Sequence, residues 1–304
     1  MDKLPASDFR SGYVAVMGRP NVGKSTLLNA LLGQKIAAVS PRPQTTRRQQ
    51  LGILTMETAQ IVFVDTPGVH KPYHKLGEVM NESAEEALQN ADLILFVADA
   101  SQAPDEEDYL LAGLVNKLKR PVPVILVMNK SDLVGPVDLD VHQAAIVELL
   151  PNCLPVQVSA AQKTNLDGLM QAVLSRLPKG APLFPEDQVT DLYEREIAAD
   201  LIREAALIHL REEVPHGISV RIDEYTEREE TGAYIAATLF VEKESHKPIV
   251  IGQGGAMLKK IGSAARVEIE KMTGRKVYLQ LRIKVQKNWR DDEKSLNNFG
   301  YRKP

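Results

Sequence analysis

The sequence predicts two domains: an α/β domain with a mostly parallel sheet and helices on both faces, followed by an α+β domain. Strand-sized apolar runs alternate with helix-like segments up to about residue 177, a pattern typical of a parallel sheet buried on both faces. Pro178, Pro182 and Pro185 fall within eight residues, together with Gly180, and such a segment neither continues a helix nor joins a sheet. We therefore expect domains at 1–178 and 189–304, joined by a linker at 179–188.

Each expected element follows from a local pattern. In the first domain, near-continuous apolar runs predict strands at 13–17, 51–56, 60–64, 93–98, 122–128 and 155–158. In the second domain, apolar residues at helical spacing predict a helix within 190–213, and strand-like runs follow at 218–225 and 233–241. A glycine loop, a helix at 257–272 and an alternating strand at 276–287 complete the order α-β-β-α-β, with room for one short helix before the glycine loop.

Composition and charge narrow the class of protein. No apolar run is long enough to cross a bilayer, and the N-terminus lacks the apolar core of a signal peptide, so we expect a cytoplasmic protein. Cys153 is the only cysteine, which excludes an internal disulfide and a zinc site built from cysteines. The net charge of −3 conceals an asymmetry, because residues 247–304 carry 14 basic and 5 acidic side chains, a net of +9. This end of the chain is suited to an anionic partner.

The stretch GRPNVGKS, residues 18–25, lies between the strand at 13–17 and a helix-like run, which is the context that a phosphate-binding loop requires. Its two glycines allow successive backbone N–H groups to point at one anion, and the following helix adds the partial positive charge of its N-terminus. Lys24 supplies a full charge for the outer phosphates, and the Ser25 hydroxyl is a ligand for Mg²⁺. The predicted nucleotide-binding residues of this loop are Gly18, Arg19, Pro20, Asn21, Val22, Gly23, Lys24, Ser25 and Thr26.

Two later segments would complete the phosphate and metal site. In the polar stretch 44–47, Thr46, favoured over Thr45, can join the Mg²⁺ shell and report the γ-phosphate. The segment Asp65-Thr66-Pro67-Gly68 follows a buried strand, where Asp65 would hold the metal through water and Gly68 would offer a backbone N–H to the γ-phosphate. The predicted metal ligands are Ser25, Thr46 and Asp65, and Thr66 and Pro67 complete the nucleotide-binding set.

Two further segments predict recognition of guanine. The Asp132 carboxylate can accept hydrogen bonds from two neighbouring guanine donors, a pair that adenine lacks, and we expect this carboxylate to be buried. Asn129 can bond the other edge of the base, and the stem of Lys130 can cover its face. Ser159 and Ala160 follow the last strand and can present a backbone N–H to the base.

In this order and strand context, the five segments resemble the translation-factor type of P-loop GTPase over residues 11–177. The resemblance implies hydrolysis of GTP with Mg²⁺ by in-line attack of water, with Lys24, Thr46, Gly68 and Asn21 as the catalytic group. Small signalling GTPases carry a glutamine where this chain has Val69, so another group must assist the water. Asn21 matches the residue that helps to hold K⁺ near the phosphates in similar GTPases, and the alternative is that it serves only as a turn residue.

The second glycine loop, Gly252-Gln253-Gly254-Gly255, lies in the basic segment and in the α-β-β-α-β order, and it resembles the GxxG loop of a type II KH domain. Glycines there allow a nucleic-acid backbone to approach, while lysines offer positive charge. The predicted RNA-binding residues are Ile251, Gly252, Gln253, Gly254, Gly255, Lys259, Lys260 and Lys287. Trp289 could stack on a base, but the favoured interpretation is a packing anchor.

A GTPase domain with GRPNVGKS, QTTR, DTPGVH and NKSD, followed by a KH domain with VIGQGG, resembles the Era family. The resemblance implies a monomeric GTP/GDP-binding switch that binds the 3′ end of small-subunit ribosomal RNA during assembly of the pre-30S particle. It also implies loose peripheral contact with the inner face of the cell membrane. The alternative is a regulatory GTPase whose main partner is a membrane or a protein, and a third interpretation, an ATPase, is opposed by Asp132.

Overall fold

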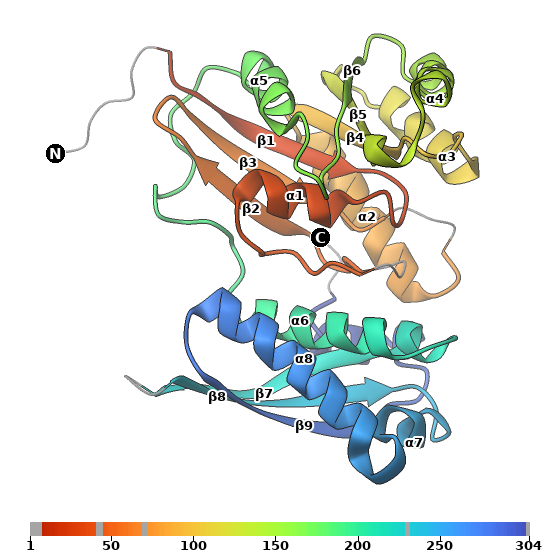
Figure 1. Ribbon diagram of the computed structural model, residues 1–304, viewed down its shortest axis with the longest axis vertical. Coiled ribbons are helices and arrows are strands. Elements are labelled where there is room, and N and C mark those ends of the chain that lie inside the picture. Colours follow the sequence, from red (N-terminus) through yellow and green to blue (C-terminus); the bar gives the residue numbers. More distant parts are fainter. Residues whose placement is uncertain (1–7, 41–44, 69–71, 229–231, 302–304) are drawn as a thin grey trace, which may run out of the picture.

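The computed structural model describes residues 8–40, 45–68, 72–228 and 232–301. The first domain contains a six-stranded sheet in the order β2-β3-β1-β4-β5-β6. All neighbours are parallel except β2 and β3, which are antiparallel (Figure 1). The strands are β1 (Arg10–Met17), β2 (Gln50–Thr55), β3 (Ala59–Asp65), β4 (Leu93–Asp99), β5 (Val124–Asn129) and β6 (Leu154–Gln157). All six expected strands are present, and β5 begins two residues late because Pro123 has no N–H for the ladder.

Helices cover both faces of this sheet, which confirms the predicted fold class. They are α1 (Lys24–Leu32), α2 (Lys75–Asn90), α3 (Glu106–Asn116), α4 (Pro136–Leu149) and α5 (Leu166–Arg176). Leu27 and Leu28 of α1 and Leu169 of α5 pack on one face of the sheet. Leu88 of α2, Leu111 of α3 and Ile146 of α4 pack on the other. Because β3 and β4 are buried along their whole length, their C-terminal ends are held rigidly at one edge of the sheet.

The second domain has the predicted order of elements, with the short extra helix present. Its elements are α6 (Glu194–His209), β7 (Ser219–Arg228), β8 (Gly232–Val241), α7 (His246–Ile251), α8 (Ala256–Thr273) and β9 (Val277–Val285). Strand β8 is central, antiparallel to β7 and parallel to β9. Helices α6 and α8 lie on the side of this sheet that faces the first domain (Figure 1), and their apolar faces share one core with it.

The linker is not a free tether, which corrects the expectation that it cannot join a sheet. Lys179 forms an isolated antiparallel bridge with Arg10 at the start of β1. The side-chain amide of Gln60 in β3 accepts hydrogen bonds from the N–H groups of Leu183 and Phe184 and donates one to the carbonyl of Phe184. Prolines remove backbone donors, but the N–H groups of Leu183 and Phe184 still find a partner on the first sheet. The domain boundaries at 178 and 189 stay predictions.

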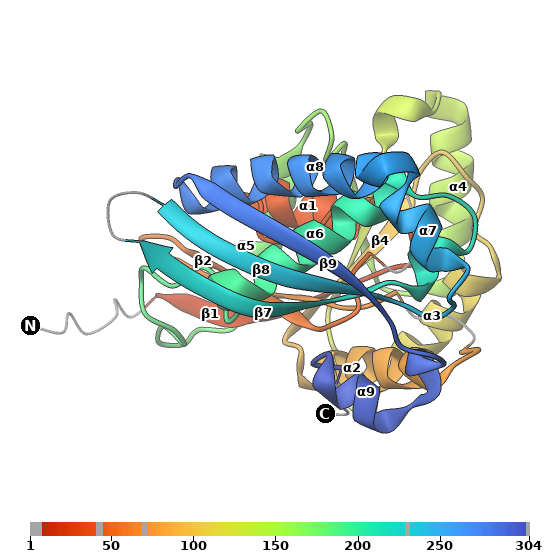
Figure 2. The same ribbon diagram turned by 90° about the horizontal axis from the view of Figure 1, so that it is seen from below.

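A C-terminal segment that we did not predict joins the two domains. After β9, helix α9 (Glu293–Asn298) lies beside α2 of the first domain (Figure 2). Trp289 is fully buried, and its indole N–H donates to the Gly217 carbonyl over 2.8 Å, so this residue is a packing anchor rather than an exposed stacking platform. It belongs to a cluster that draws side chains from both domains: Leu76, Met80, Phe240, Trp289, Leu296, Phe299 and Tyr301.

In the described part of the chain, no helix has the length and apolar character needed to cross a membrane.

Candidate functional site: a nucleotide pocket and a nucleic-acid groove

The phosphate loop connects β1 to α1 and holds Lys24 over its own backbone. Gly23 precedes the helix with φ of 97°, a left-handed conformation that favours glycine. The Lys24 ammonium donates to the carbonyls of Gly18 at 2.7 Å and Arg19 at 3.0 Å. Burial lowers the pKa of Lys24 to about 8, because a buried ammonium is less well solvated than one in water. The ammonium therefore lies inside the loop, next to the backbone N–H groups predicted to bind phosphate.

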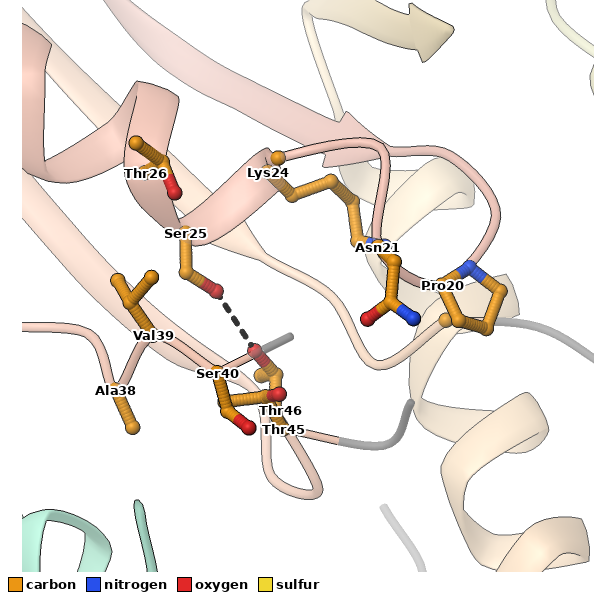
Figure 3. Close-up of a pocket in the computed structure, with 12 residues that line it drawn as sticks. Pro20, Asn21, Lys24, Ser25, Thr26, Ala38, Val39, Ser40, Thr45 and Thr46 are labelled. Atoms are coloured by element: carbon orange, nitrogen blue, oxygen red, sulfur yellow. Dashed lines mark hydrogen bonds between the residues drawn. The ribbon is translucent and has the colours of Figure 1, made fainter. Parts of the chain in front are cut away.

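The three predicted metal ligands come together from three separate segments. The Ser25 hydroxyl lies 3.1 Å from the Thr46 hydroxyl (Figure 3), and the Thr46 hydroxyl donates to Asp65 Oδ2 over 3.0 Å. Ser25 Oγ is 3.4 Å from the same carboxylate oxygen. Asp65 is fully buried and its Oδ1 has no hydrogen-bond partner in the described structure. Burial raises the pKa of this carboxyl to about 6, and the nearby Lys24 charge opposes the rise.

This set of oxygen atoms fits Mg²⁺. Hard divalent cations prefer carboxylate and hydroxyl oxygens, and Mg²⁺ is usually held by one or two protein groups plus phosphates and water. The orphaned Asp65 Oδ1 needs such a partner, because a buried carboxylate oxygen without one is costly. No group of three or more His, Cys, Asp and Glu side chains among the described residues could hold a metal, so the hydroxyl groups are essential to this fit.

A cavity is lined by Lys24, Ser25 and Thr46, and sequence reasoning missed part of the remaining lining. Pro20, Asn21, Gly23, Thr26 and Gly68 line it as predicted, and Figure 3 places Asn21 beside Pro20 in the same loop as Lys24. Gly68 lies against Pro20, since a Cβ on this glycine would come within 3.2 Å of the proline ring. The missed lining residues are Ala38, Val39 and Ser40, whose short side chains carry no motif, and Thr45 lines the same cavity.

The side chains of several other predicted nucleotide-binding residues bond to, or pack against, the rest of the protein. The Arg19 guanidinium points to the start of α3, where it pairs with Asp105 at 2.9 Å and Asp108 at 3.2 Å. The Thr66 hydroxyl donates to the Val16 carbonyl over 2.9 Å and so fastens β3 to β1. Val22 and Pro67 are buried. Gln44 and Val69 lie outside the described residues.

Asn129, at the end of β5, ties three loops together. Its amide donates to the Val22 carbonyl over 2.8 Å, and its Oδ1 accepts the Ala160 N–H over 3.0 Å. The Ser159 N–H donates to the Thr164 carbonyl over 3.3 Å. The N–H groups of Ser159 and Ala160 therefore have partners within the protein, contrary to the expectation that they are available to a base.

Lys130 and Asp132 follow Asn129 in a single tight turn. Lys130 has φ of 63°, and its ammonium pairs over 2.6 Å with Asp99 at the end of β4, which holds the aliphatic stem in place. Sequence reasoning missed Asp99, although its position at a strand end beside β5 was a signal. Asp132 is exposed, which corrects the expectation of a buried carboxylate. A bound base would itself have to exclude water from this group.

In the second domain, the glycine loop has the backbone that its sequence predicts. Gly252 has φ of 72°, and a Cβ there would come within 2.7 Å of the Met257 backbone nitrogen. Gly254 and Gly255 also have positive φ, and a Cβ on either would meet nothing within 4 Å. The side chains of Gln253, Lys259, Lys260 and Lys287 are exposed, whereas Ile251 is half-buried.

A groove runs from this loop between α8 and β9, and it joins the predicted Gly255 and Lys259 to residues that no motif identified. The groove is lined by Gly255, Leu258, Lys259, Gly262, Ser263, Arg266, Tyr278, Leu279 and Leu281. Gly262 lets the helix approach the strand, since a Cβ would come within 3.3 Å of Leu281. Tyr278 is exposed, and its ring stacks on that of Tyr234 at a centroid distance of 5.8 Å. Lys260 and Lys287 are not part of this lining. The groove thus combines leucine side chains, the Tyr278 ring and the cations Lys259 and Arg266, a combination that suits a single-stranded nucleic acid.

Comparisons with known proteins match both domains. The family model for 50S ribosome-binding GTPases matches residues 13–130, and the KH-domain model matches residues 213–290. GTPase Era of Caldicellulosiruptor saccharolyticus is 45% identical over 96% of this chain and 98% of its own length. GTPase Era of Halothermothrix orenii is 45% identical over 97% of this chain and 99% of its own.

Solved structures give the same result over both domains together. A crystal structure of Era with MgGDPNP and nucleotides 1506–1542 of 16S ribosomal RNA has a TM-score of 0.90 and 41% identity, covering 96% of this chain and 99% of that one. A point variant of Aquifex aeolicus Era bound to GDP·AlF₄⁻ has a TM-score of 0.90 and 42% identity, covering 96% of this chain and 99% of that one. With identity at this level along nearly the whole chain, the protein belongs to the Era family of GTPases.

Proposed function

We propose that this GTPase is a switch that binds the 3′ end of small-subunit ribosomal RNA and acts in assembly of the pre-30S particle. The observation that carries the proposal is the convergence of Ser25, Thr46 and Asp65 beside Lys24, in the same chain as a cationic groove behind a GxxG loop. The RNA target is supported by the similar Era structure that contains nucleotides 1506–1542 of 16S ribosomal RNA.

In the nucleotide pocket, each group has one part of the chemistry. Lys24 would exchange its bonds to the Gly18 and Arg19 carbonyls for phosphate oxygens. Ser25, Thr46 and Asp65 would hold Mg²⁺, which when bound neutralises phosphate charge. Gly68 would donate its N–H to the γ-phosphate. Water then attacks the γ-phosphorus in line, and the bond from that phosphorus to the bridging oxygen of GDP breaks.

Selection of guanine would depend on Asp132, whose carboxylate accepts from two guanine donors. Lys130, anchored by Asp99, would cover the face of the base with its stem. Asn129 would act mainly by holding the base loop and the phosphate loop in one arrangement, because both ends of its amide have protein partners. K⁺ beside Asn21 is a second proposed cofactor, which would add positive charge near the phosphates.

The proposed RNA contacts fall into two groups. The loop Gly252–Gly255 and the exposed Lys259 would bind the sugar-phosphate backbone at the mouth of the groove. Leu258, Tyr278 and Leu281 would contact bases within it. Lys260 and Lys287 would add long-range attraction rather than contacts in the groove. We place the protein in the cytoplasm as a monomer, with loose contact to the inner face of the membrane as a further proposal.

One experiment in the full-length protein tests the nucleotide site and its separation from the RNA groove. Lys24→Ala should remove most of the affinity for Mg·GTP, because it deletes the fixed charge inside the loop. RNA affinity measured without nucleotide should stay within about twofold of wild type, since the groove lies in the other domain. Substitution of the exposed Lys119 by alanine is the control.

The alternative, a GTPase with a membrane or protein partner, would be favoured if anionic vesicles bound more tightly than single-stranded RNA at equal salt.

A further inference from the structure

Helix α6 of the second domain holds described residues of the segment 35–47, which are 35–40 and 45–47. One carboxylate oxygen of Glu204 lies 2.8 Å from the Lys35 ammonium, and the other accepts the Val39 N–H over 3.1 Å. The neighbouring Arg203 donates to the Thr45 carbonyl. Two consecutive residues of one helix therefore hold described parts of this segment that lie on either side of residues 41–44.

The same domain also holds the residue that follows Thr46. The Arg47 guanidinium is buried and donates over 2.8 Å to each of the carbonyls of His216 and Ile218. It also lies over the Trp289 ring at 5.6 Å from the centroid. Thr46 is thus fastened to the second domain through both of its neighbours, while its hydroxyl points to Asp65 in the first domain.

Lys35 links α6 to α8, the helix that lines the groove of the second domain. Its ammonium lies 2.8 Å from Glu268 of α8 as well as from Glu204 of α6. Glu268 is two residues beyond Arg266, which lines the groove. Val39, at the other end of the Glu204 carboxylate, lines the nucleotide cavity. Contacts therefore run without a break from the groove helix to the wall of the nucleotide pocket.

We propose that Glu204 is a positioning residue of the nucleotide site, which holds Val39 in the wall of the cavity that Thr46 also lines. The inference rests on the proposed role of Thr46 as the group that responds to Mg²⁺ and the γ-phosphate. Because GDP has no γ-phosphate, the grip of Glu204 favours the triphosphate over the diphosphate. A residue of the second domain thereby affects the relative affinity of the first domain for the triphosphate and the diphosphate.

The test is the ratio of dissociation constants for GDPNP and GDP, measured with saturating Mg²⁺ on the full-length protein. Glu204→Ala should weaken GDPNP binding about 5- to 10-fold relative to GDP, which is an ordinary coupling between sites. Lys35→Met releases the same carboxylate from the other side and should shift the ratio in the same direction. Glu194→Ala is the matched control, because it removes a carboxylate from the same helix that bonds Tyr225 and faces Arg275 within the second domain.

A melting curve for each variant separates positioning from folding, and Lys35→Met carries the test if Glu204→Ala is largely unfolded. An unchanged ratio in a folded Glu204→Ala or Lys35→Met protein overturns the inference and leaves the proposed function standing. Equal losses for GDPNP and GDP also overturn it, since they indicate a structural role only. Failure of the wild-type protein to bind either nucleotide would instead refute the proposed function, and this inference with it.

Discussion

The side-chain amide of Asn129 donates to the carbonyl of Val22 over 2.8 Å, and this bond joins the base loop to the phosphate loop. Both groups are buried, so the bond is shielded from competition with water. The two loops are 107 positions apart along the chain, and this one side chain links them directly. The arrangement of the pocket thus depends on a residue whose motif is associated with the base alone.

Asn129→Ala should weaken GTP and GDP binding by similar factors, because it leaves the Val22 carbonyl and the Ala160 N–H without partners in a buried site. A cost of about 1–3 kcal/mol is expected for such a loss. Isothermal titration with both nucleotides measures it. Asn116→Ala is the control: it removes an exposed hydrogen bond from a side-chain amide to the Leu149 carbonyl, and it should leave the affinity for both nucleotides unchanged. Weaker binding of GTP with unchanged binding of GDP would contradict the view that Asn129 links the two loops in the same way for both nucleotides.

Asp132→Asn should reduce affinity for GTP and raise affinity for xanthosine triphosphate, because an amide can donate to the extra carbonyl of xanthine. The side chain is exposed, so the free energy of unfolding should change by less than about 0.5 kcal/mol. Competition between the two nucleotides measures the switch. Base recognition by Asp132 would be refuted if GTP affinity were unchanged and the xanthine nucleotide gained nothing.

GTP hydrolysis should be faster in K⁺ than in Na⁺ at equal ionic strength, with Asn21 responsible for the difference. The residue has φ of 65°, so Asn21→Gly removes the side chain without adding backbone strain, which an alanine would introduce. Single-turnover rates in the two salts should become equal in this variant. Equal rates in the wild-type protein would rule out the cation and leave Asn21 as a turn residue.

Replacing Gln253 and Gly254 by aspartate should reduce RNA affinity and make its dependence on salt shallower, since two negative charges would oppose nearby phosphates. Gly254 has φ of 57°, so any side chain there costs backbone strain. The double asparagine variant carries the same strain without the charge and is therefore the matched control. RNA binding across a salt series separates the two. Similar RNA affinity in both variants would mean that the loop does not contact phosphate.

Trp289→Ala should destabilise the protein by about 3–5 kcal/mol, the usual cost of removing a buried aromatic side chain. The indole packs edge-on to Phe299 at a centroid distance of 5.3 Å and donates to the Gly217 carbonyl. Denaturant unfolding measures the loss. Trp289→Phe keeps most of the apolar surface and should cost less. A loss under about 1 kcal/mol would indicate that the cluster can collapse around the cavity.

Much of the first domain could be predicted from the sequence because its signals are local. The six strands, the phosphate loop and the sites of Thr46 and Asp65 each depend on fewer than ten consecutive residues. A strand that is apolar throughout must be buried on both faces, and a glycine at positive φ is readable from the loop itself. The GxxG loop and the alternating strand β9 were predictable for the same reason.

The partners of these segments were decided only by the tertiary structure. Glu204 and Val39 are 165 positions apart, and neither belongs to a motif, so nothing local indicates that they are hydrogen-bonded. Arg19 looked like a phosphate ligand, but two carboxylates at the start of α3 take its charge. Asp132 was expected to be buried, yet burial depends on what covers a side chain in space. By itself the sequence determined backbone conformation and the chemical type of each group, because both are set by neighbouring residues. Packing of distant segments determined which charges remain available to a ligand, because pairing and desolvation depend on distances that only the folded chain defines.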